Sequence, residues 1–148
     1  MYLPLFINLA GKDVLVVGGG KIATRRALNL LKNGARVTVI SKEFSEELKG
    51  KEIELVEKDL RGESISLSKY FLVVIATDDE EVNEKICRIA MDEGILVNRA
   101  DNSKEGNVIF PVVSEIEGNL IAFTTLGKDP ALSRKIREII EKCCREQE

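Results

Sequence analysis

Apolar and polar positions along the first two thirds of the chain switch repeatedly between strand-like and helix-like spacing. Apolar runs predict five strands, at residues 12–17, 36–40, 53–57, 71–76 and 95–98. Helical spacing and turn residues predict helices at residues 21–33, 43–49 and from about 79 to 93, and the polar segment 61–69 is compatible with a short helix. Strands that alternate with helices are typical of parallel sheets, so we expect an α/β fold with a doubly wound sheet.

The last third of the chain departs from that alternation. Apolar runs at residues 108–113 and 120–125 flank a turn at 117–119, which predicts a hairpin. Residues 130–145 then have the spacing of one amphipathic helix. A hairpin and a single helix form a thin module that leaves apolar surface exposed, so we expect a partner subunit to cover it.

The chain is therefore expected to have two parts. Residues 1–105 form the sheet domain, and residues 106–148 form the module of hairpin and helix. A weakly alternating segment at residues 2–9 is expected to be extended at a sheet edge, because Pro4 cannot donate a hydrogen bond to the ladder.

A glycine turn follows the first predicted strand. Gly18, Gly20 and Ala23 match the G-x-G-x-x-G/A fingerprint of dinucleotide-binding proteins, between a strand and a helix as the fingerprint requires. Gly18 permits the tight turn, Gly20 lets the backbone approach a pyrophosphate, and Ala23 lets the helix pack closely on the strand. The helix start, with Lys21 and Ile22, is then expected to hold the phosphates. A glycine-rich turn without a ligand is the alternative, but the context favours a nucleotide site on a Rossmann-type sheet.

The residues after the second strand do not decide whether the cofactor carries a ribose 2′-hydroxyl, as in NAD, or a 2′-phosphate, as in NADP. Domains that bind NAD usually place an acid there, about twenty residues past the glycines, to hold the ribose hydroxyl. This chain instead has Ser41, Lys42 and Glu43, which we take as candidate cofactor contacts. Ser41 and Lys42 are equally suited to the 2′-phosphate of NADP, whereas Glu43 either reaches the ribose or is the first-turn acid of a helix.

Polar residues also follow the fourth predicted strand. Thr77 and Asp78 emerge at the carboxyl edge of the sheet, where doubly wound folds bind their ligands, so both are candidate cofactor contacts. Capping of the next helix by Asp78 or Asp79 is an equally weighted explanation for one of these acids.

Composition narrows the classes of function. The chain has 148 residues, a formal net charge of −3 and no histidine. Negative charge argues against nucleic acid as the main partner, and the lack of histidine leaves proton transfer to a carboxylate, lysine, tyrosine or cysteine. No apolar run reaches the roughly 18 residues of a membrane span and no signal-peptide pattern opens the chain, so we expect a cytoplasmic protein. The three cysteines lack metal-ligand spacing, and no metal site is expected.

Several segments together resemble the precorrin-2 dehydrogenases, the NAD-dependent enzymes of sirohaem synthesis, including the N-terminal part of the multifunctional sirohaem synthases. Each segment alone is weak, but their order and spacing over nearly the whole chain are specific. The matching segments are Leu3-Pro4-Leu5-Phe6, Val17-Gly18-Gly19-Gly20-Lys21-Ile22-Ala23 with Arg25, Ala76-Thr77-Asp78-Asp79 with Asn83, Val97-Asn98-Arg99-Ala100-Asp101, Ile109-Phe110-Pro111 and Pro130-Ala131-Leu132-Ser133-Arg134-Lys135-Ile136-Arg137.

The resemblance implies a Rossmann domain followed by a dimerisation region, a homodimer, and oxidation of the tetrapyrrole precorrin-2 to sirohydrochlorin with NAD as hydride acceptor. It implies that Asp101 is the catalytic carboxylate, which in bifunctional members is also implicated in ferrochelation. The residues agree with the first role, because Asp101 lies just past a predicted strand and hydride removal must be matched by loss of a proton. An Asx-turn or a cap is the alternative role for Asp101.

Precorrin-2 carries several carboxylates, so its site is expected to offer cations. Lys128 and Arg134 lie near the loop expected to face the substrate, and Arg99 lies beside Asp101. Thr125 stands where a serine is common in the family. A solvated helix face is the alternative for the helix cations, because acids interleave the same helix.

Two departures from the family concern the same region. Leu126 replaces a glycine in the run before the last helix, which bears on the substrate or dimer contacts of that loop. Many members also continue into a C-terminal helical domain, whereas this sequence ends at Glu148. We expect that a smaller site suffices, that the dimer partner supplies the missing wall, or that another chain completes the enzyme.

A protein of a different class is the second hypothesis. Non-catalytic NAD(H)-sensing modules also pair a Rossmann core with dimerisation, but they usually keep an acid at the end of the second strand. This chain has Ser41 there.

Overall fold

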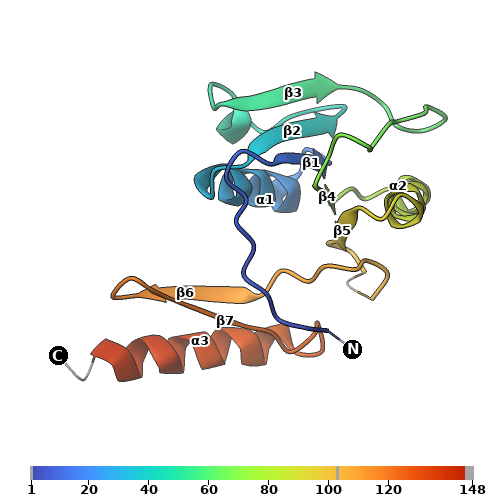
Figure 1. The fold of residues 1–148 in the computed structure, drawn as a ribbon. Coiled ribbons are helices and arrows are strands. Elements are labelled where there is room, and N and C mark those ends of the chain that lie inside the picture. The colour runs from blue at the N-terminus through green and yellow to red at the C-terminus, as the bar shows by residue number, and fades with distance from the viewer. Residues whose placement is uncertain (1, 103, 146–148) are drawn as a thin grey trace. The chain divides into compact units, whose positions relative to one another are not determined.

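Five parallel strands build the sheet of the first of two structural units (Figure 1). The computed structural model describes residues 2–102 and 104–145, and the first unit extends to Val108. The strands are β1 Asp13–Val17, β2 Arg36–Ser41, β3 Ile53–Glu57, β4 Leu72–Ile75 and β5 Leu96–Arg99. They lie in the order β3-β2-β1-β4-β5, so β1 is central and the carboxyl ends of all five strands share one edge.

Two helices connect these strands. α1 Lys21–Lys32 leads from β1 to β2, and α2 Glu80–Asp92 leads from β4 to β5 in the opposite direction across the sheet. Parallel crossovers are right-handed, so this reversal places the two helices on opposite faces. The predicted doubly wound α/β fold is confirmed. No helix within the described residues is long and apolar enough to cross a membrane.

The central strand is buried on both faces. Leu15 and Val17 share a core cluster with Ile86 of α2. Val14 and Val16, both 0% exposed, point to the other face, on which α1 packs. Each of these side chains contributes about 1.5–3 kcal/mol by its burial. The sheet is therefore a rigid platform for the loops at its carboxyl edge.

The helix predicted at residues 43–49 and the short helix compatible with residues 61–69 are not formed as expected. Residues 43–49 contain only a short 3-10 helix, η1 Glu46–Leu48. Residues 61–69 contain no helix, because Gly62 has a left-handed φ of +74° and Leu67 is drawn into the core with 0% exposure. Anchoring of an apolar side chain in the core there replaces helix formation.

The sheet-edge segment expected at residues 2–9 is also not formed. This segment pairs with no strand in the described part of the chain. Its apolar side chains, such as Leu5 at 70% and Phe6 at 71% exposure, gain no burial from the sheet that would favour pairing.

The second unit begins at Ile109 and consists of a hairpin and a helix. Its elements are β6 Val112–Ile116, β7 Asn119–Phe123 and α3 Pro130–Arg145. Glu117 and Gly118 form the hairpin turn with positive φ angles of 48° and 75°, as type I′ turns require. β6 begins four residues later than predicted, because Val108 donates its N–H to the Val97 carbonyl at 3.0 Å and Pro111 has no N–H.

Packing within the second unit leaves much apolar surface uncovered. α3 packs on β6, where the buried Ser114 hydroxyl donates to Glu141 Oε1 at 3.0 Å. Large apolar side chains of all three elements remain 43% to 53% exposed, namely Val113, Leu120, Leu132 and Ile139.

Candidate active site

A cavity of about 770 Å³ lies at the carboxyl edge of the sheet in the first unit. It opens between the ends of β1 and β4, which are neighbours in the sheet although β2 and β3 separate them in the sequence. This is the topological switch point, at which doubly wound folds bind their ligands. Its volume is in the range of small-molecule and cofactor sites. The cavity lining includes all nine predicted cofactor residues: Gly18, Gly20, Lys21, Ile22, Ser41, Lys42, Glu43, Thr77 and Asp78.

The three glycines of the turn have different structural reasons. Gly18 has a φ of +120°, and a Cβ there would lie 2.3 Å from the Ala76 carbonyl oxygen of the neighbouring strand end. A Cβ at Gly19 would lie 1.8 Å from the Glu43 carbonyl oxygen, a requirement that the fingerprint did not predict. A Cβ at Gly20 would meet nothing within 4 Å. Gly18 and Gly19 are thus required by the protein's own packing, whereas Gly20 leaves open space at the helix start.

The N-terminus of α1 is left without a cap. Gly20 is its N-cap residue with extended backbone, no side chain accepts a hydrogen bond there, and the first turn contains no acid. The first N–H groups of a helix have no partner within the helix, and they carry partial positive charge. An open helix start beside open space fits the pyrophosphate of a dinucleotide, and the residues present therefore fit this cofactor.

The end of β2 forms the far wall of the cavity. The Glu43 N–H donates to Ser41 Oγ at 3.5 Å, so the predicted helix acid instead closes a tight loop over Gly19. Lys42 Nζ lies 2.9 Å from Asp59 Oδ2, which follows β3 and also lines the cavity. Asp59 was not singled out from the sequence, although its position just after a predicted strand was the available signal.

The N-terminus of α2 is closed by a side chain of its own segment. The Asp79 carboxylate accepts the Val82 N–H at 3.1 Å, and Thr77 Oγ1 accepts the Asp79 N–H at 3.1 Å. Of the two acids that were equally suited to this role, Asp79 is thus the cap. Asp78 is not needed for capping and lines the cavity.

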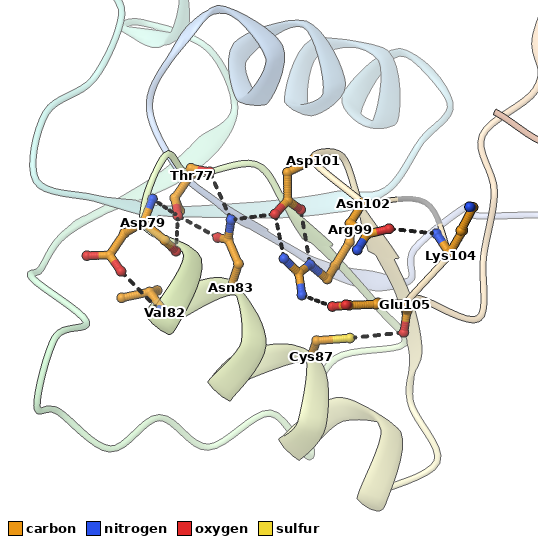
Figure 2. Close-up of polar contacts among 10 residues, drawn as sticks. All are labelled: Thr77, Asp79, Val82, Asn83, Cys87, Arg99, Asp101, Asn102, Lys104 and Glu105. Atoms are coloured by element: carbon orange, nitrogen blue, oxygen red, sulfur yellow. Dashed lines mark hydrogen bonds and ion pairs between the residues drawn. The ribbon is translucent and has the colours of Figure 1, made fainter. Parts of the chain in front are cut away.

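Asp101 is joined to that helix start by a chain of hydrogen bonds (Figure 2). The Asn83 amide donates to Asp101 Oδ2 at 3.1 Å and to the Thr77 carbonyl oxygen at 2.9 Å. The Thr77 hydroxyl donates in turn to Asn83 Oδ1 at 2.5 Å. Because Thr77 lines the cavity, Asp101 lies one hydrogen-bonded side chain away from the predicted cofactor site.

Arg99 holds the same carboxylate from the other side. Its Nε donates to Asp101 Oδ1 at 3.0 Å and its Nη2 to Oδ2 at 2.5 Å, while its Nη1 pairs with Glu105 (Figure 2). The Arg99 hydrogen bonds, opposed in part by burial, hold the pKa of Asp101 below its ordinary value, so this group is ionised at neutral pH. Asp101 remains about one third exposed and accessible to a ligand.

The surroundings of Arg99 count against the substrate contact predicted for it. The Arg99 side chain is only 1% exposed, and both ends of its guanidinium group are paired with carboxylates of its own unit. Cys87 is also part of this buried layer, because its thiol donates to the Glu105 carbonyl oxygen at 3.3 Å and burial raises its pKa. Arg99 therefore orients Asp101 and is too deeply buried to present its guanidinium to a tetrapyrrole carboxylate.

The loop after Asp101 is fixed to β5. The Asn98 amide donates to the Val108 carbonyl oxygen at 2.8 Å, and the Asn107 amide donates to the Ile95 carbonyl oxygen at 3.1 Å. A Cβ at Gly106 would lie 2.6 Å from the Val97 carbonyl oxygen, so the loop needs glycine at this close approach. Asp101 is thus held at the base of an anchored loop.

Three predicted substrate contacts, Thr125, Lys128 and Arg134, belong to the second unit. The Thr125 hydroxyl accepts the Asp129 N–H at 3.1 Å and donates to the Asp129 carbonyl oxygen at 3.0 Å, so it shapes the turn before α3. Leu126, which replaces the family's glycine, has a left-handed φ of 55° and keeps the backbone conformation that glycine favours. A contact of these residues with substrate remains a prediction.

The fold and this cavity define a Rossmann-type dinucleotide-binding protein. Residues 5–112 match the protein family described as "Putative NAD(P)-binding". The chain is also similar to a solved structure of SirC, a precorrin-2 dehydrogenase, with 34% identity, a TM-score of 0.78, and coverage of 96% of this chain and 70% of that one. The chain belongs to this NAD(P)-binding family, within the group of the precorrin-2 dehydrogenases.

Longer proteins are similar over the same region. A sirohaem synthase of Photorhabdus laumondii is 38% identical over 144 residues, and sirohaem synthase 2 of Aeromonas salmonicida is 40% identical over 143 residues. Each alignment covers 95% of this chain. The chain spans 30% and 29% of the lengths of these two relatives.

Proposed function

We propose that the protein is a precorrin-2 dehydrogenase, which oxidises precorrin-2 to sirohydrochlorin in sirohaem synthesis with NAD as hydride acceptor. The observation that carries this proposal is the position of Asp101. An ionised, partly exposed carboxylate lies one hydrogen-bonded residue away from a cavity that fits a dinucleotide. An NAD(P)-binding module without chemistry would have no need of such a carboxylate beside its cofactor site.

The first turn of α1 would hold the cofactor. The open N–H groups there would bind the pyrophosphate, and the bound dinucleotide would supply the hydride acceptor. Gly20 leaves the space for the phosphates, and Thr77 and Asp78 bound the opposite side of the cavity.

Asp101 would accept the proton that the substrate must lose. Removal of a hydride leaves positive charge on the tetrapyrrole, and a carboxylate nearby stabilises that charge. The lowered pKa of Asp101 makes it a weak base, which suffices because the substrate proton becomes acidic as the hydride leaves. Arg99 and Asn83 act through Asp101 by fixing its two oxygens, so we assign both as positioning residues.

The second unit would bind a second copy of the chain. The exposed apolar side chains on β6, β7 and α3 are of the kind that a homodimer interface would bury. Lys128 and Arg134 of this unit remain the proposed contacts for tetrapyrrole carboxylates, with Thr125 shaping the loop beside them. We propose that the enzyme acts in the cytoplasm as this dimer.

Turnover of precorrin-2 tests the proposal. The purified chain is mixed anaerobically with precorrin-2 and NAD, and NADH formation is followed together with the spectrum of sirohydrochlorin. We expect both to appear in equal amounts. NADH binding without any oxidation of precorrin-2 would contradict the proposed function and favour a sensing module.

The role of Asp101 is tested with Asp101→Asn, which keeps the size of the side chain. We expect turnover to fall at least about 100-fold, as for the loss of a general base, while NADH affinity stays within about twofold. The control is Asp92→Asn, which removes one charge from the last residue of α2 and has an expected turnover equal to that of the natural sequence. An Asp101→Asn variant with an unchanged rate would refute the assignment.

A further inference from the structure

Two lysines line the cavity where the ends of β2 and β3 meet, and both are already ion-paired. Lys42 Nζ lies 2.9 Å from Asp59 Oδ2, and Lys58 Nζ lies 2.8 Å from Glu63 Oε2. Arg61 also contacts Asp59, with Nη2 3.2 Å from Oδ2. A cation whose charge is balanced by a neighbouring carboxylate attracts a further anion less strongly. Asp59 therefore offsets part of the positive charge that this end of the cavity would otherwise present to a phosphate group.

Strand register brings these side chains together. Ser41 at the end of β2 pairs with Glu57 at the end of β3, and the Lys58 N–H donates to the Ser41 carbonyl oxygen at 2.9 Å. The residues that follow, Lys42 and Asp59, leave the sheet at the same carboxyl edge. The acid that β2 lacks at its own end is thus supplied by the neighbouring strand.

We propose that Asp59 is the specificity-determining residue that makes this cavity select NAD over NADP. The proposal rests on the cofactor site of the proposed function. In Rossmann domains the adenine ribose lies beyond the end of the second strand, where a 2′-hydroxyl or a 2′-phosphate is discriminated. Asp59 occupies that end with negative charge and holds Lys42, the cation that would otherwise receive a 2′-phosphate.

The carboxylate keeps its charge under all conditions in which dinucleotides are tested. Hydrogen bonds from Lys42 and Arg61 hold the pKa of Asp59 far below its ordinary value. The side chains of Lys42 and Asp59 are 50% and 46% exposed, so salt screens their effect on a phosphate. The preference is therefore expected to be moderate and to weaken as the salt concentration rises.

The test measures binding of NADH and NADPH to the full chain and needs no turnover. The protein contains no tryptophan, so the fluorescence of the reduced nicotinamide can be followed directly. We expect the natural sequence to bind NADH about tenfold more tightly than NADPH at low salt, the ratio that about 1.4 kcal/mol provides. Asp59→Asn is expected to reduce this ratio about fivefold, through tighter binding of NADPH.

Two further variants assign the effect to this ion pair. Adding Lys42→Met to Asp59→Asn is expected to cancel the gain for NADPH, because it removes the released cation. The matched control is Glu46→Gln, which breaks the exposed ion pair of Glu46 with Lys49 and changes net charge by the same amount at a residue that does not line the cavity. This control is expected to leave the ratio unchanged.

The outcomes separate this inference from the proposed function. Equal affinity of the natural sequence for NADH and NADPH, or an Asp59→Asn ratio equal to that of the natural sequence, would overturn the role of Asp59. A gain for NADPH that persists in the double variant would overturn the role of Lys42 as its receiver. The expected ratios without oxidation of precorrin-2 would support Asp59 and contradict only the proposed function.

Discussion

The two helices of the sheet domain begin at the same edge of the sheet but differ at their first turn. α1 begins after Gly20 with no capping side chain and no acid in its first turn. α2 begins after Asp79, whose carboxylate accepts the Val82 N–H, and has Glu80 and Glu81 in its first turn. One helix start is thus open to an anion, and the other is already closed by carboxylates of the protein.

Because of this difference, the two helix starts are suited to different roles at the carboxyl edge of the sheet. The open start of α1, next to the space at Gly20, is suited to the phosphates of a dinucleotide. The closed start of α2 is a fixed support, from which Thr77 and Asn83 reach Asp101. Cofactor binding is accordingly assigned to the end of β1, and proton transfer to Asp101 after β5, with the start of α2 after β4 between them.

The largest expected effect is a difference in stability between alanine substitutions at two glycines of the same turn, Gly18 and Gly20. Gly18→Ala forces a side chain at a φ of +120° to within 2.3 Å of the Ala76 carbonyl oxygen. We expect the free energy of unfolding, measured with urea, to fall by at least about 3 kcal/mol. Gly20→Ala meets nothing within 4 Å and is expected to change it by less than about 0.5 kcal/mol.

The affinity for NADH distinguishes Gly20 from Gly18 in the opposite sense to stability. Gly20→Ala narrows the space beside the helix start, and we expect NADH to bind at least about tenfold more weakly although the fold is intact. Equal stability losses in the Gly18→Ala and Gly20→Ala variants would show that both glycines serve packing alone. That result would contradict the assignment of Gly18 to packing and Gly20 to cofactor binding.

A smaller effect is expected at the closed helix start. Asp79→Ala removes the cap of α2, so the free energy of unfolding should fall by about 1 kcal/mol. The affinity for NADH should not fall, because this change removes negative charge from the cavity edge. Thermal and urea unfolding, with an NADH titration, check both parts. A Tm equal to that of the natural sequence would contradict the capping role.

The smallest effect concerns the dependence of stability on pH. Contact with Arg99 lowers the folded pKa of Asp101 below 3.8, its ordinary value. Its contribution is therefore fully present above that value and is lost as pH falls through the folded pKa. The natural sequence should be more stable than Asp101→Asn by roughly 0.5–1 kcal/mol at pH 5–7, since Asp101 is partly exposed. Urea unfolding at pH values below 3.8 should show this difference becoming smaller as the pH falls, and a difference that grows as the pH falls would refute it.

The sequence was sufficient where local patterns determine structure. The strand, the glycine turn and the helix around Gly18 to Ala23 are predictable because an apolar run, the fingerprint glycines and helical spacing are all local signals. The last helix, Pro130–Arg145, was predicted with its bounds because its proline start and its apolar spacing agree. Only the side-chain geometry shows which of Asp78 and Asp79 caps α2, and it is Asp79.

Features that depend on contacts between distant segments were not predictable. The sequence predicts Arg99 as a substrate contact because it is a cation beside Asp101. No local signal indicates its burial between Asp101 and Glu105, where it is 1% exposed. Lys42 was read as a possible phosphate contact, since its partner Asp59 is placed beside it only by the register of β2 and β3. A short helix was compatible with residues 61–69 because the anchoring of Leu67 in the core has no local signal.

The central claim is that the open start of α1 is the pyrophosphate site, and Gly20→Asp tests it most directly. This variant gives α1 the acidic cap that α2 already has, at a position with extended backbone and open space for the side chain. Gly20→Asn, which adds a cap without charge, is the control. The measurement is an NADH fluorescence titration at low salt, with the Tm of each variant.

We expect Gly20→Asp to keep or slightly raise the Tm, because a capping acid stabilises a helix start by about a few tenths of a kcal/mol relative to glycine. NADH should bind at least about tenfold more weakly than to the natural sequence, and more weakly than to Gly20→Asn, since the new carboxylate repels the pyrophosphate. Undiminished NADH affinity in a folded Gly20→Asp variant would contradict the claim that this helix start holds the cofactor.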